Sequence, residues 1–314
     1  MMDFAFVFPG QGSQSVGMMA GLSGHAVVRE TFAEAAQVLG QDFWTLASEG
    51  PEDALARTVV TQPLMLTADV AVWRLWCSQR AERPAVVAGH SLGEYAALVA
   101  ADAIGFADAL RITRVRAEAM QAAVPEGSGG MAAILGLDDA AVEAACTEAA
   151  QGEVLEPANF NSPGQVVIAG TRAAVERGVA AAKARGAKRA LMLPMSVPSH
   201  CALMHGAAET LAQALAGIEV RTPRITVLHN VDMAAHQDPA DIRAALKRQL
   251  FSPVRWVGSL QAVAGRGISA VAECGPGKVL APLCRRIDDR LQGTALVDDA
   301  AIATFAGLIS GAAA

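Results

Sequence analysis

Residues 86–94 constrain the fold of this chain more than any other stretch of the sequence. A short β-branched apolar run ends in Gly-His-Ser-Leu-Gly, and an alanine-rich helical pattern follows at residues 95–101. A strand, a sharp turn and a helix in this order lift a serine hydroxyl off the end of a sheet and point the first helical amides towards its target. We therefore expect Ser91 to be a nucleophile. The alternative is an ordinary serine that caps the N-terminus of a helix.

The length and composition of the chain indicate a compact globular protein. Its 314 residues can bury a large core, and 53% of them are hydrophobic while 18% are charged. The formal net charge of -6 argues against a general nucleic-acid binder. The sequence shows neither an apolar run long enough for a membrane span nor a positively charged signal-peptide start. The five cysteines lack Cys-x-x-Cys spacing, so we expect no disulfide, no zinc site and a cytoplasmic location.

Strand and helix patterns alternate along most of the chain, which favours a parallel, layered α/β sheet. The strands expected in this sheet lie at residues 4–8, 85–88, 225–229, 270–273 and 294–297. Helical spacing is expected between them at residues 27–39, 63–79, 95–101, 106–124, 203–215, 241–249 and 257–264.

The middle of the chain follows a different, self-contained βαββαβ order. Strands are expected there at residues 131–137, 155–160, 165–169 and 188–194, with helices at 139–150 and 173–185. This order suits a small ferredoxin-like insert. We therefore expect a large α/β domain formed by residues 1–126 and 196–314, and a small ferredoxin-like subdomain formed by residues 127–195.

The helical pattern at residues 106–124 carries an arginine in an unexpected position. At about 100° per residue, Ile112, Val115 and Ala119 fall in one apolar sector, and Arg116 falls inside it. A charged arginine is seldom buried without a partner. We therefore expect Arg116 to meet a buried protein carboxylate or an anionic ligand. A structural ion pair and a snorkelling side chain are the alternatives.

A serine hydroxyl needs a base to take its proton, and the sequence offers six histidines. His200 is the best candidate by position, because it lies where the large domain resumes after the insert. His90 lies in the serine turn itself, where a neighbouring side chain generally points away from the serine. No acid stands out near His200 in the sequence. A Ser–His pair steadied by a backbone carbonyl is therefore expected.

A tetrahedral oxyanion needs two converging N–H donors. The amide of Leu92, which follows the expected nucleophile, is the natural first donor. The turn Gly10-Gln11-Gly12 after the first strand could supply the second donor through Gln11. The competing interpretation of this turn is a phosphate loop, but it lacks the Gly-Lys-Ser/Thr of a P-loop and the Gly-x-Gly-x-x-Gly of a dinucleotide fold.

Five motifs spread over nearly the whole chain are more informative together than any one of them alone. They are Phe8-Pro9-Gly10-Gln11-Gly12-Ser13-Gln14, Gly89-His90-Ser91-Leu92-Gly93-Glu94, Pro157-Ala158-Asn159-Phe160-Asn161-Ser162-Pro163-Gly164-Gln165, Val197-Pro198-Ser199-His200 and Glu273-Cys274-Gly275-Pro276-Gly277. In this order and spacing they resemble the malonyl-CoA:acyl-carrier-protein transacylases, the acyltransferases of bacterial fatty-acid synthesis.

The resemblance implies a role for each matching residue. Ser91 would carry the malonyl ester, and His200 would act first as general base and then as general acid. Arg116 would pair with the free malonyl carboxylate, and the amides of Gln11 and Leu92 would form the oxyanion hole.

The resemblance also implies a backbone partner for the histidine and a two-part pocket. In this family a backbone carbonyl orients the histidine, and the matching position here is Gln249. His90 and Asn161 would line the pocket between the domains. The large domain would resemble an α/β-hydrolase core with the ferredoxin-like subdomain beside it.

The implied reaction moves a malonyl group from malonyl-CoA to the phosphopantetheine thiol of an acidic acyl carrier protein. We expect no cofactor, no metal, no membrane or nucleic-acid partner, and a monomer. Lys278, Arg285 and Arg286 are weak basic candidates for contact with the carrier protein. The alternatives are acyl transfer for a polyketide synthase or a malonate-decarboxylase complex, a serine hydrolase that uses the same turn, and a non-catalytic scaffold that keeps the fold.

Overall fold

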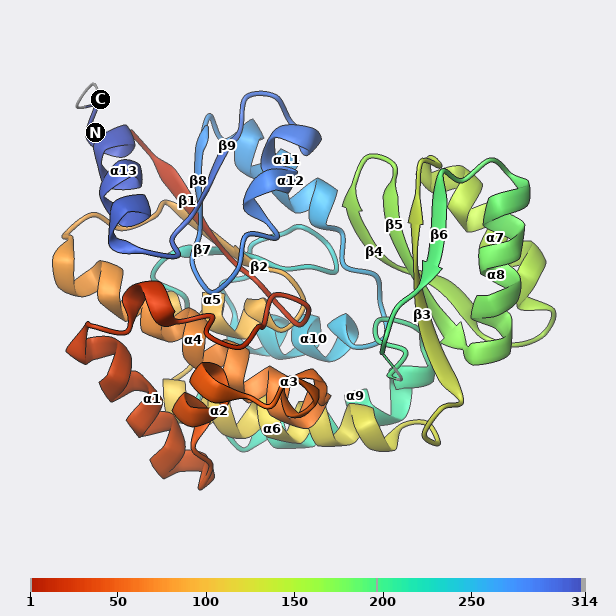
Figure 1. The fold of residues 1–314 in the computed structure, drawn as a ribbon, viewed down its shortest axis with the longest axis horizontal. Coiled ribbons are helices and arrows are strands. Elements are labelled where there is room, and N and C mark those ends of the chain that lie inside the picture. The colour runs from red at the N-terminus through yellow and green to blue at the C-terminus, as the bar shows by residue number, and fades with distance from the viewer. Residues whose placement is uncertain (1, 196, 312–314) are drawn as a thin grey trace.

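The computed structural model describes residues 2–195 and 197–311, which form two lobes, each built on one β-sheet (Figure 1). The sheet of the larger lobe is parallel throughout, and that of the smaller lobe is antiparallel. The parallel sheet has the order β7 (Thr226–Leu228), β2 (Val86–Gly89), β1 (Phe4–Phe8), β8 (Ala270–Glu273) and β9 (Gln292–Ala295). This arrangement confirms the expected α/β fold class with a layered parallel sheet.

Helices cover both faces of the parallel sheet. Successive residues of β1 point to opposite sides, so each face of the sheet packs into its own core cluster. Phe4, Phe6 and Phe8 belong to the larger core cluster, and Ala5 and Val7 belong to a second cluster on the other face. The larger cluster draws on α1 (Ala26–Leu39), α4 (Thr58–Gln79), α5 (Gly93–Ala100), α6 (Phe106–Ala122), α9 (His205–Ala216), α10 (Pro239–Gln249) and α13 (Asp299–Ser310). The second cluster draws on α11 (Trp256–Gly265) and α12 (Ala281–Ile287).

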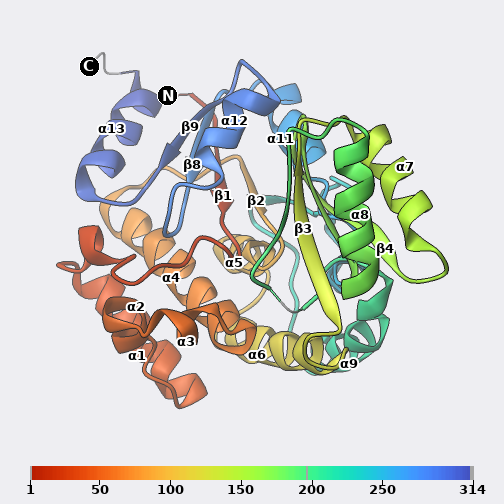
Figure 2. The same cartoon turned by 45° about the vertical axis from the view of Figure 1, so that its right-hand side comes forward.

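The smaller lobe has the ferredoxin-like arrangement expected from the sequence. Its strands have the order β4 (Leu155–Ser162), β5 (Gln165–Thr171), β3 (Gly129–Leu135) and β6 (Arg189–Met192). The helices α7 (Asp139–Ala150) and α8 (Arg172–Ala184) lie together against this sheet, as the turned view in Figure 2 shows. Asp138 caps α7 by accepting a hydrogen bond of 2.7 Å from the amide of Ala141.

The two lobes are joined by main-chain hydrogen bonds as well as by the connecting segments. The amide of Phe160 in β4 donates to the carbonyl of Val254, and the amide of Val254 donates to the carbonyl of Ala158, both over 2.9 Å. The division of the chain into residues 1–126 with 196–314 and residues 127–195 stays a prediction. Its boundary residue 196 lies outside the described residues.

The serine turn lies directly on the main chain at the end of β1. A Cβ atom on Gly93 would collide with the carbonyl group of Phe8, and one on Gly89 would collide with the main chain of Gly93. Ser91 between them has a φ of 52°, a left-handed conformation that is uncommon for residues other than glycine. The glycines of the Gly-x-Ser-x-Gly pattern are therefore required by close backbone contact, which holds the strained serine in place.

The structure differs from the sequence predictions in several helices and at the ends of several strands; β3, for example, spans Gly129–Leu135 rather than residues 131–137. The helix expected from residue 63 begins at Thr58, so Pro63 lies inside α4 although proline cannot donate the helical hydrogen bond there. Nearly every side of α4 is buried, and this burial outweighs the lost hydrogen bond. The last strand is β9 at Gln292–Ala295 rather than at residues 294–297. The helices that the sequence did not predict are α2 (Phe43–Glu49), α3 (Glu52–Ala56), α12 and α13.

Gly93→Ala is expected to destabilise the protein, because the added methyl group has no space against Phe8 and Pro9. Overpacking of this kind costs about 1–3 kcal/mol or more. Urea unfolding followed by circular dichroism measures the change in the free energy of unfolding. Gly307→Ala in α13 is the matched control, because no atom outside its own helix turn lies within 4 Å of the place that the added methyl group would take. It should stabilise the protein by roughly 0.5–1 kcal/mol, and an equal effect of both variants would contradict the close contact.

Candidate active site

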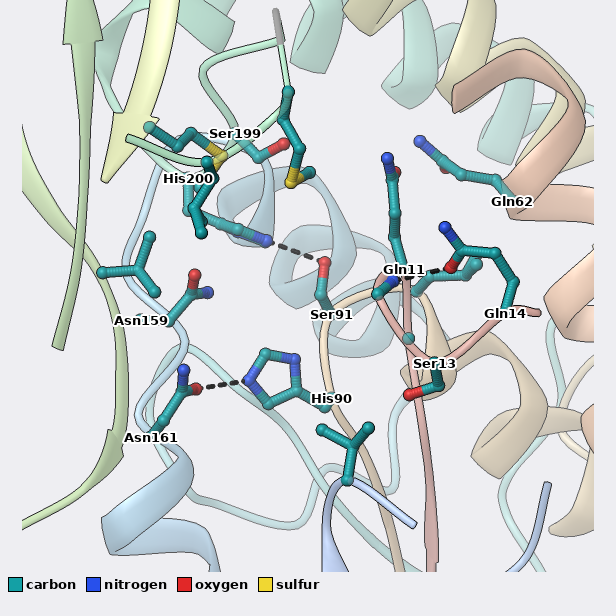
Figure 3. Close-up of a pocket in the computed structure, with 18 of the residues that line it drawn as sticks. Gln11, Ser13, Gln14, Gln62, His90, Ser91, Asn159, Asn161, Ser199 and His200 are labelled. Atoms are coloured by element: carbon teal, nitrogen blue, oxygen red, sulfur yellow. Dashed lines mark hydrogen bonds between the residues drawn. The ribbon is translucent and has the colours of Figure 1, made fainter. Parts of the chain in front are cut away.

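A cavity of about 460 Å³ lies between the two lobes, and Ser91 lies on its wall. Figure 3 shows the side chains of Ser91 and His200 joined by a hydrogen bond, with His90 and Asn161 below them. The larger lobe contributes the serine turn, the glycine turn after β1 and residues of α4 and α6, while the smaller lobe contributes residues of β3, β4 and β5. The expected site residues lining the cavity are Gln11, His90, Ser91, Leu92, Arg116, Asn161 and His200.

The structure brings Ser91 and His200 into direct contact. Ser91 Oγ and His200 Nε2 lie 2.7 Å apart, although the two residues are far apart in the sequence. His200 Nδ1 lies 2.8 Å from the main-chain carbonyl oxygen of Gln249, which can only accept, so Nδ1 carries the ring proton. Nε2 is then the acceptor, and the serine hydroxyl donates to it.

His200 is held rigidly in an unusual backbone conformation. Its φ is 63°, and its amide donates to the carbonyl of Leu250 over 3.0 Å. The residue is 3% exposed. Burial and the nearby positive charge of Arg116 lower the pKa of His200 from its ordinary value of 6.5 to about 3. The imidazole is therefore neutral, with a free Nε2 lone pair, throughout the physiological pH range.

Arg116 is buried beside the serine, as its position in the apolar sector of α6 required. It is 1% exposed, and its Nη2 lies 3.2 Å from Ser91 Oγ. Nη1 donates to Gln62 Oε1 over 2.6 Å, and Nη2 also donates to Gln249 Oε1 over 3.0 Å. These acceptors are a hydroxyl and two amides, so none of the three is charged. Burial lowers the pKa of Arg116, which is consistent with a charge that is costly to bury.

The main chain of the serine turn is fixed by the side chain of Asn230. Asn230 Oδ1 accepts from the amide of Ser91 over 2.7 Å, and its Nδ2 donates to the carbonyl of Gly89 over 2.6 Å. The side chain of Gln249 completes this support, because its Nε2 donates to the carbonyl of Ser91 over 2.9 Å. The turn that carries Ser91 is therefore held by polar contacts to three of its main-chain groups.

The glycine turn after β1 lies against the serine turn. A Cβ atom on Gly10 would collide with the carbonyl of His90 and would lie 3.7 Å from the amide nitrogen of Leu92. Gln11 therefore follows a residue in direct contact with the serine turn, and its side chain accepts from Thr58 Oγ1 over 2.8 Å. The two residues expected to supply oxyanion donors, Gln11 and Leu92, line the same cavity as Ser91.

His90 and Asn161 connect the two lobes across the cavity. His90 Nε2 and Asn161 Oδ1 lie 2.8 Å apart, and the imidazole also packs edge-on against Trp256 with ring centroids 5.3 Å apart. His90 is thus bonded to the smaller lobe. This position agrees with the expectation that an imidazole next to the serine does not serve as its base.

Three residues of the site were not singled out by the sequence analysis. Asn230 lies two residues after the end of β7, and side chains at the carboxyl end of parallel strands often bind ligands, so its position was a usable signal. Glu94 belongs to the quoted serine motif but received no role. Gln62 lies within α4, where nothing in the sequence distinguishes it from other helical glutamines.

The structure shows where the basic residues expected to contact a carrier protein lie, and it allows a search for metal sites and membrane-spanning helices. Lys278, Arg285 and Arg286 are exposed, and Arg286 donates to Gln165 Oε1 over 2.9 Å. Residues 2–195 and 197–311 contain no cluster of His, Cys, Asp or Glu side chains that could hold a metal ion. Over the same residues, no helix is both long enough and apolar enough to cross a membrane. The five cysteines are free thiols.

Comparison with known proteins identifies the class of this fold and site. The family described as "Acyl transferase domain" matches residues 5–310 of the chain. Nearly the whole chain is therefore an acyltransferase domain, which agrees with a serine and a histidine paired at the edge of a parallel sheet.

Individual relatives narrow this class. The malonyl CoA-acyl carrier protein transacylase of Salmonella typhimurium is 56% identical over 303 residues, which cover 96% of this chain and 98% of the relative. The crystal structure of the acyl-carrier-protein S-malonyltransferase of Burkholderia pseudomallei is 55% identical, with a TM-score of 0.95 over 96% of this chain and 99% of the other. The chain therefore belongs to the malonyl CoA-acyl carrier protein transacylase family.

A third relative was solved together with its partner. It is a malonyl-transacylase in complex with the acyl-carrier protein of a type II polyketide synthase, 50% identical with a TM-score of 0.96. The match covers 99% of this chain and 100% of the other.

The pKa of His200 predicts the pH dependence of serine acylation. Because the pKa is lowered to about 3, the imidazole stays neutral far below pH 6.5 and loses its capacity as a base only near its folded pKa. The second-order rate constant for acylation reports the ionisation of the free enzyme. Rapid-quench measurements should show no inflection near the ordinary histidine pKa between about pH 8 and about pH 5. An inflection near 6.5 would contradict the assigned protonation state.

Proposed function

We propose that this protein transfers a malonyl group from malonyl-CoA to the phosphopantetheine thiol of an acyl carrier protein, through an ester on Ser91. The observation that carries the proposal is the buried guanidinium of Arg116, whose Nη2 lies 3.2 Å from Ser91 Oγ. A cation fixed beside the nucleophile suits an acyl group that ends in a carboxylate. The names of the relatives, which are 50–56% identical, support the same substrate and carrier.

In the first half-reaction, Ser91 Oγ attacks the thioester carbonyl of malonyl-CoA. His200 Nε2 takes the hydroxyl proton as the new C–O bond forms, and the carbonyl oxygen becomes an oxyanion. The amides of Gln11 and Leu92 are the proposed donors to this oxyanion. When the tetrahedral intermediate collapses, the C–S bond breaks and the proton passes from His200 to the departing thiolate of CoA.

The second half-reaction runs through the same groups in reverse. The carrier thiol gives its proton to His200 and attacks the Ser91 ester, and the ester oxygen recovers the proton as it leaves. The cycle is therefore ping-pong and consumes neither cofactor nor metal. Water must be kept from the ester between the two halves, which fits a nucleophile that lies in a cavity between two lobes.

The role of Gln249 separates this proposal from a conventional serine hydrolase. In a Ser-His-Asp triad a buried carboxylate stabilises the imidazolium. Here the Nδ1 proton of His200 meets the carbonyl oxygen of Gln249, which orients the ring but carries no full charge. We propose that this neutral partner, with Arg116 facing the acyl group, favours malonyl transfer to a thiol over general ester hydrolysis.

The other expectations about partners and location stay predictions. We expect the protein to be a cytoplasmic monomer that supplies malonyl groups to fatty-acid synthesis. We also expect the carrier protein to contact the exposed side chains of Lys278, Arg285 and Arg286. The polyketide complex among the solved relatives keeps a polyketide carrier open as a second acceptor. Assays with carriers of both kinds measure which one discharges the enzyme faster.

Ser91→Ala should abolish formation of the acyl-enzyme. Wild-type protein incubated with malonyl-CoA is expected to gain the mass of one malonyl group, and addition of holo acyl carrier protein should remove it. Intact-protein mass spectrometry measures both events. A malonyl adduct that survives in Ser91→Ala would place the nucleophile elsewhere, and an adduct that water removes as fast as the carrier does would identify a hydrolase.

Arg116→Ala should remove the preference for malonyl-CoA over acetyl-CoA. A charge-assisted hydrogen bond contributes about 1.5–3 kcal/mol, so loss of the pair with the malonyl carboxylate should lower kcat/KM for malonyl-CoA on the order of 100-fold. Acetyl-CoA has no carboxylate and should lose much less. Arg114→Ala is the matched control, because Arg114 lies on the same helix and bonds Gln41 outside the cavity. Equal losses on both substrates in Arg116→Ala would refute the carboxylate role.

A further inference from the structure

Glu94 is a buried carboxylate directly behind the nucleophile, and the mechanism above does not use it. It lies in the first turn of α5, three residues after Ser91, and is fully shielded from solvent. Its Oε1 lies 2.7 Å from His229 Nδ1. Its Oε2 accepts from the amide of Asn230 over 3.1 Å and from Gln249 Nε2 over 2.8 Å. Two chain segments, residues 229–230 and the end of α10, therefore converge on this side chain beneath the active serine.

The contact with Glu94 helps to hold the side-chain amide of Gln249 in one orientation. A carboxylate only accepts hydrogen bonds, so the amide nitrogen of Gln249 must face Glu94, where it also reaches the carbonyl of Ser91. The amide oxygen is then turned towards Arg116 and accepts from Nη2 over 3.0 Å. That same Nη2 lies beside Ser91 Oγ. The orientation of one buried amide thus connects Glu94 to the guanidinium.

The contact with Asn230 acts on the other side of the serine turn. Glu94 accepts from the main-chain amide of Asn230, and the side chain of Asn230 holds the amide of Ser91 and the carbonyl of Gly89. His229, the preceding residue, is itself buried and bonded to the same carboxylate. Glu94 therefore ties the end of β7 and the end of α10 to the serine turn.

We propose that Glu94 is a positioning residue that sets the malonyl preference of the enzyme by orienting the Gln249 side-chain amide against Arg116. This inference rests on the proposed malonyl transfer. Glu94 acts on Arg116 indirectly, because the neutral side-chain amide of Gln249 lies between the carboxylate and the guanidinium. A carboxylate in direct contact with Arg116 would occupy the donors that the malonyl carboxylate needs. The intervening amide fixes Arg116 in place and leaves its charge available to the substrate.

The substitution Glu94→Gln tests this arrangement with little change in shape. A glutamine at position 94 carries no charge and accepts through a single oxygen, so it holds the amide nitrogen of Gln249 less firmly than the carboxylate does, and the contact of Gln249 with Arg116 loosens. Single-turnover acylation of Ser91 is measured by rapid quench and intact mass, with malonyl-CoA and with acetyl-CoA. The malonylation rate constant should fall about tenfold or more, and the acetylation rate constant about threefold or less. The malonyl-to-acetyl ratio is the diagnostic quantity, because a merely structural role would lower both rates together.

A second variant keeps the test independent of how well Glu94→Gln folds. Gln249→Met removes the side-chain amide but keeps the main-chain carbonyl that accepts from His200. It should lower the same ratio, and the double variant should lower it no further, because Glu94 acts through Gln249. An unchanged ratio in either single variant, or additive losses in the double variant, would overturn the proposal.

Two controls separate this proposal from loss of stability and from failure of the proposed function. Asp138→Ala removes the N-cap of α7 in the smaller lobe and should lower the melting temperature by a few degrees while leaving the ratio unchanged. Wild-type malonylation at Ser91 tests the function itself. If the wild type is malonylated at Ser91 and the variants keep the wild-type malonyl-to-acetyl ratio, only the role of Glu94 is refuted. If the wild type is not malonylated, both the proposed function and the role of Glu94 are refuted.

Discussion

Direct contact between two stretches of main chain, without side chains between them, is the constraint on which the site depends. The serine turn lies against the end of β1, where Gly93 meets the carbonyl of Phe8 and Gly10 meets the carbonyl of His90. This contact sets the left-handed conformation of Ser91 and brings the two turns that carry Gln11 and Leu92 to one wall of the cavity. The side chains of Asn230 and Gln249 then hold the serine turn in this position by hydrogen bonds to its main chain.

The electrostatics of the site follow from how its buried guanidinium is surrounded. Arg116 donates to Gln62, Gln249 and Ser91, all through uncharged oxygens. Such an environment keeps a guanidinium in a fixed geometry without neutralising it. The same positive charge, together with burial, lowers the pKa of His200, so the group that would anchor the substrate also keeps the base unprotonated. In the proposed mechanism, substrate anchoring and the protonation state of the base are therefore linked.

The sequence predicted the parts of the molecule that local patterns determine. The strand–turn–helix at Ser91, the βαββαβ order of the smaller lobe and the buried position of Arg116 all follow from periodicity and turn chemistry. Helices α2, α3 and α12 are no longer than seven residues, too short for the helical period to be recognised. The caps of α13, Asp298 and Gly311, were usable signals for that helix. The partners of Ser91 could not be predicted locally, since Asn230 lies 139 residues away in sequence. The helical pattern left a protein carboxylate or an anionic ligand as the expected partner of Arg116. The structure shows that its hydrogen-bond acceptors within the protein are two amides and a hydroxyl, which only tertiary contacts reveal.

The main-chain carbonyl that orients His200 has a consequence for how this site can change during evolution. When an aspartate orients the histidine, one nucleotide change can delete the oxygen that does so. The carbonyl of Gln249 belongs to the peptide backbone, so every substitution at that position retains it. The side chain at position 249 can therefore change without loss of this carbonyl, and such a change would act on the serine turn and on Arg116 instead. The main-chain carbonyl of Gln249 thus orients His200, while its side chain, in our proposal, acts on the choice of acyl group.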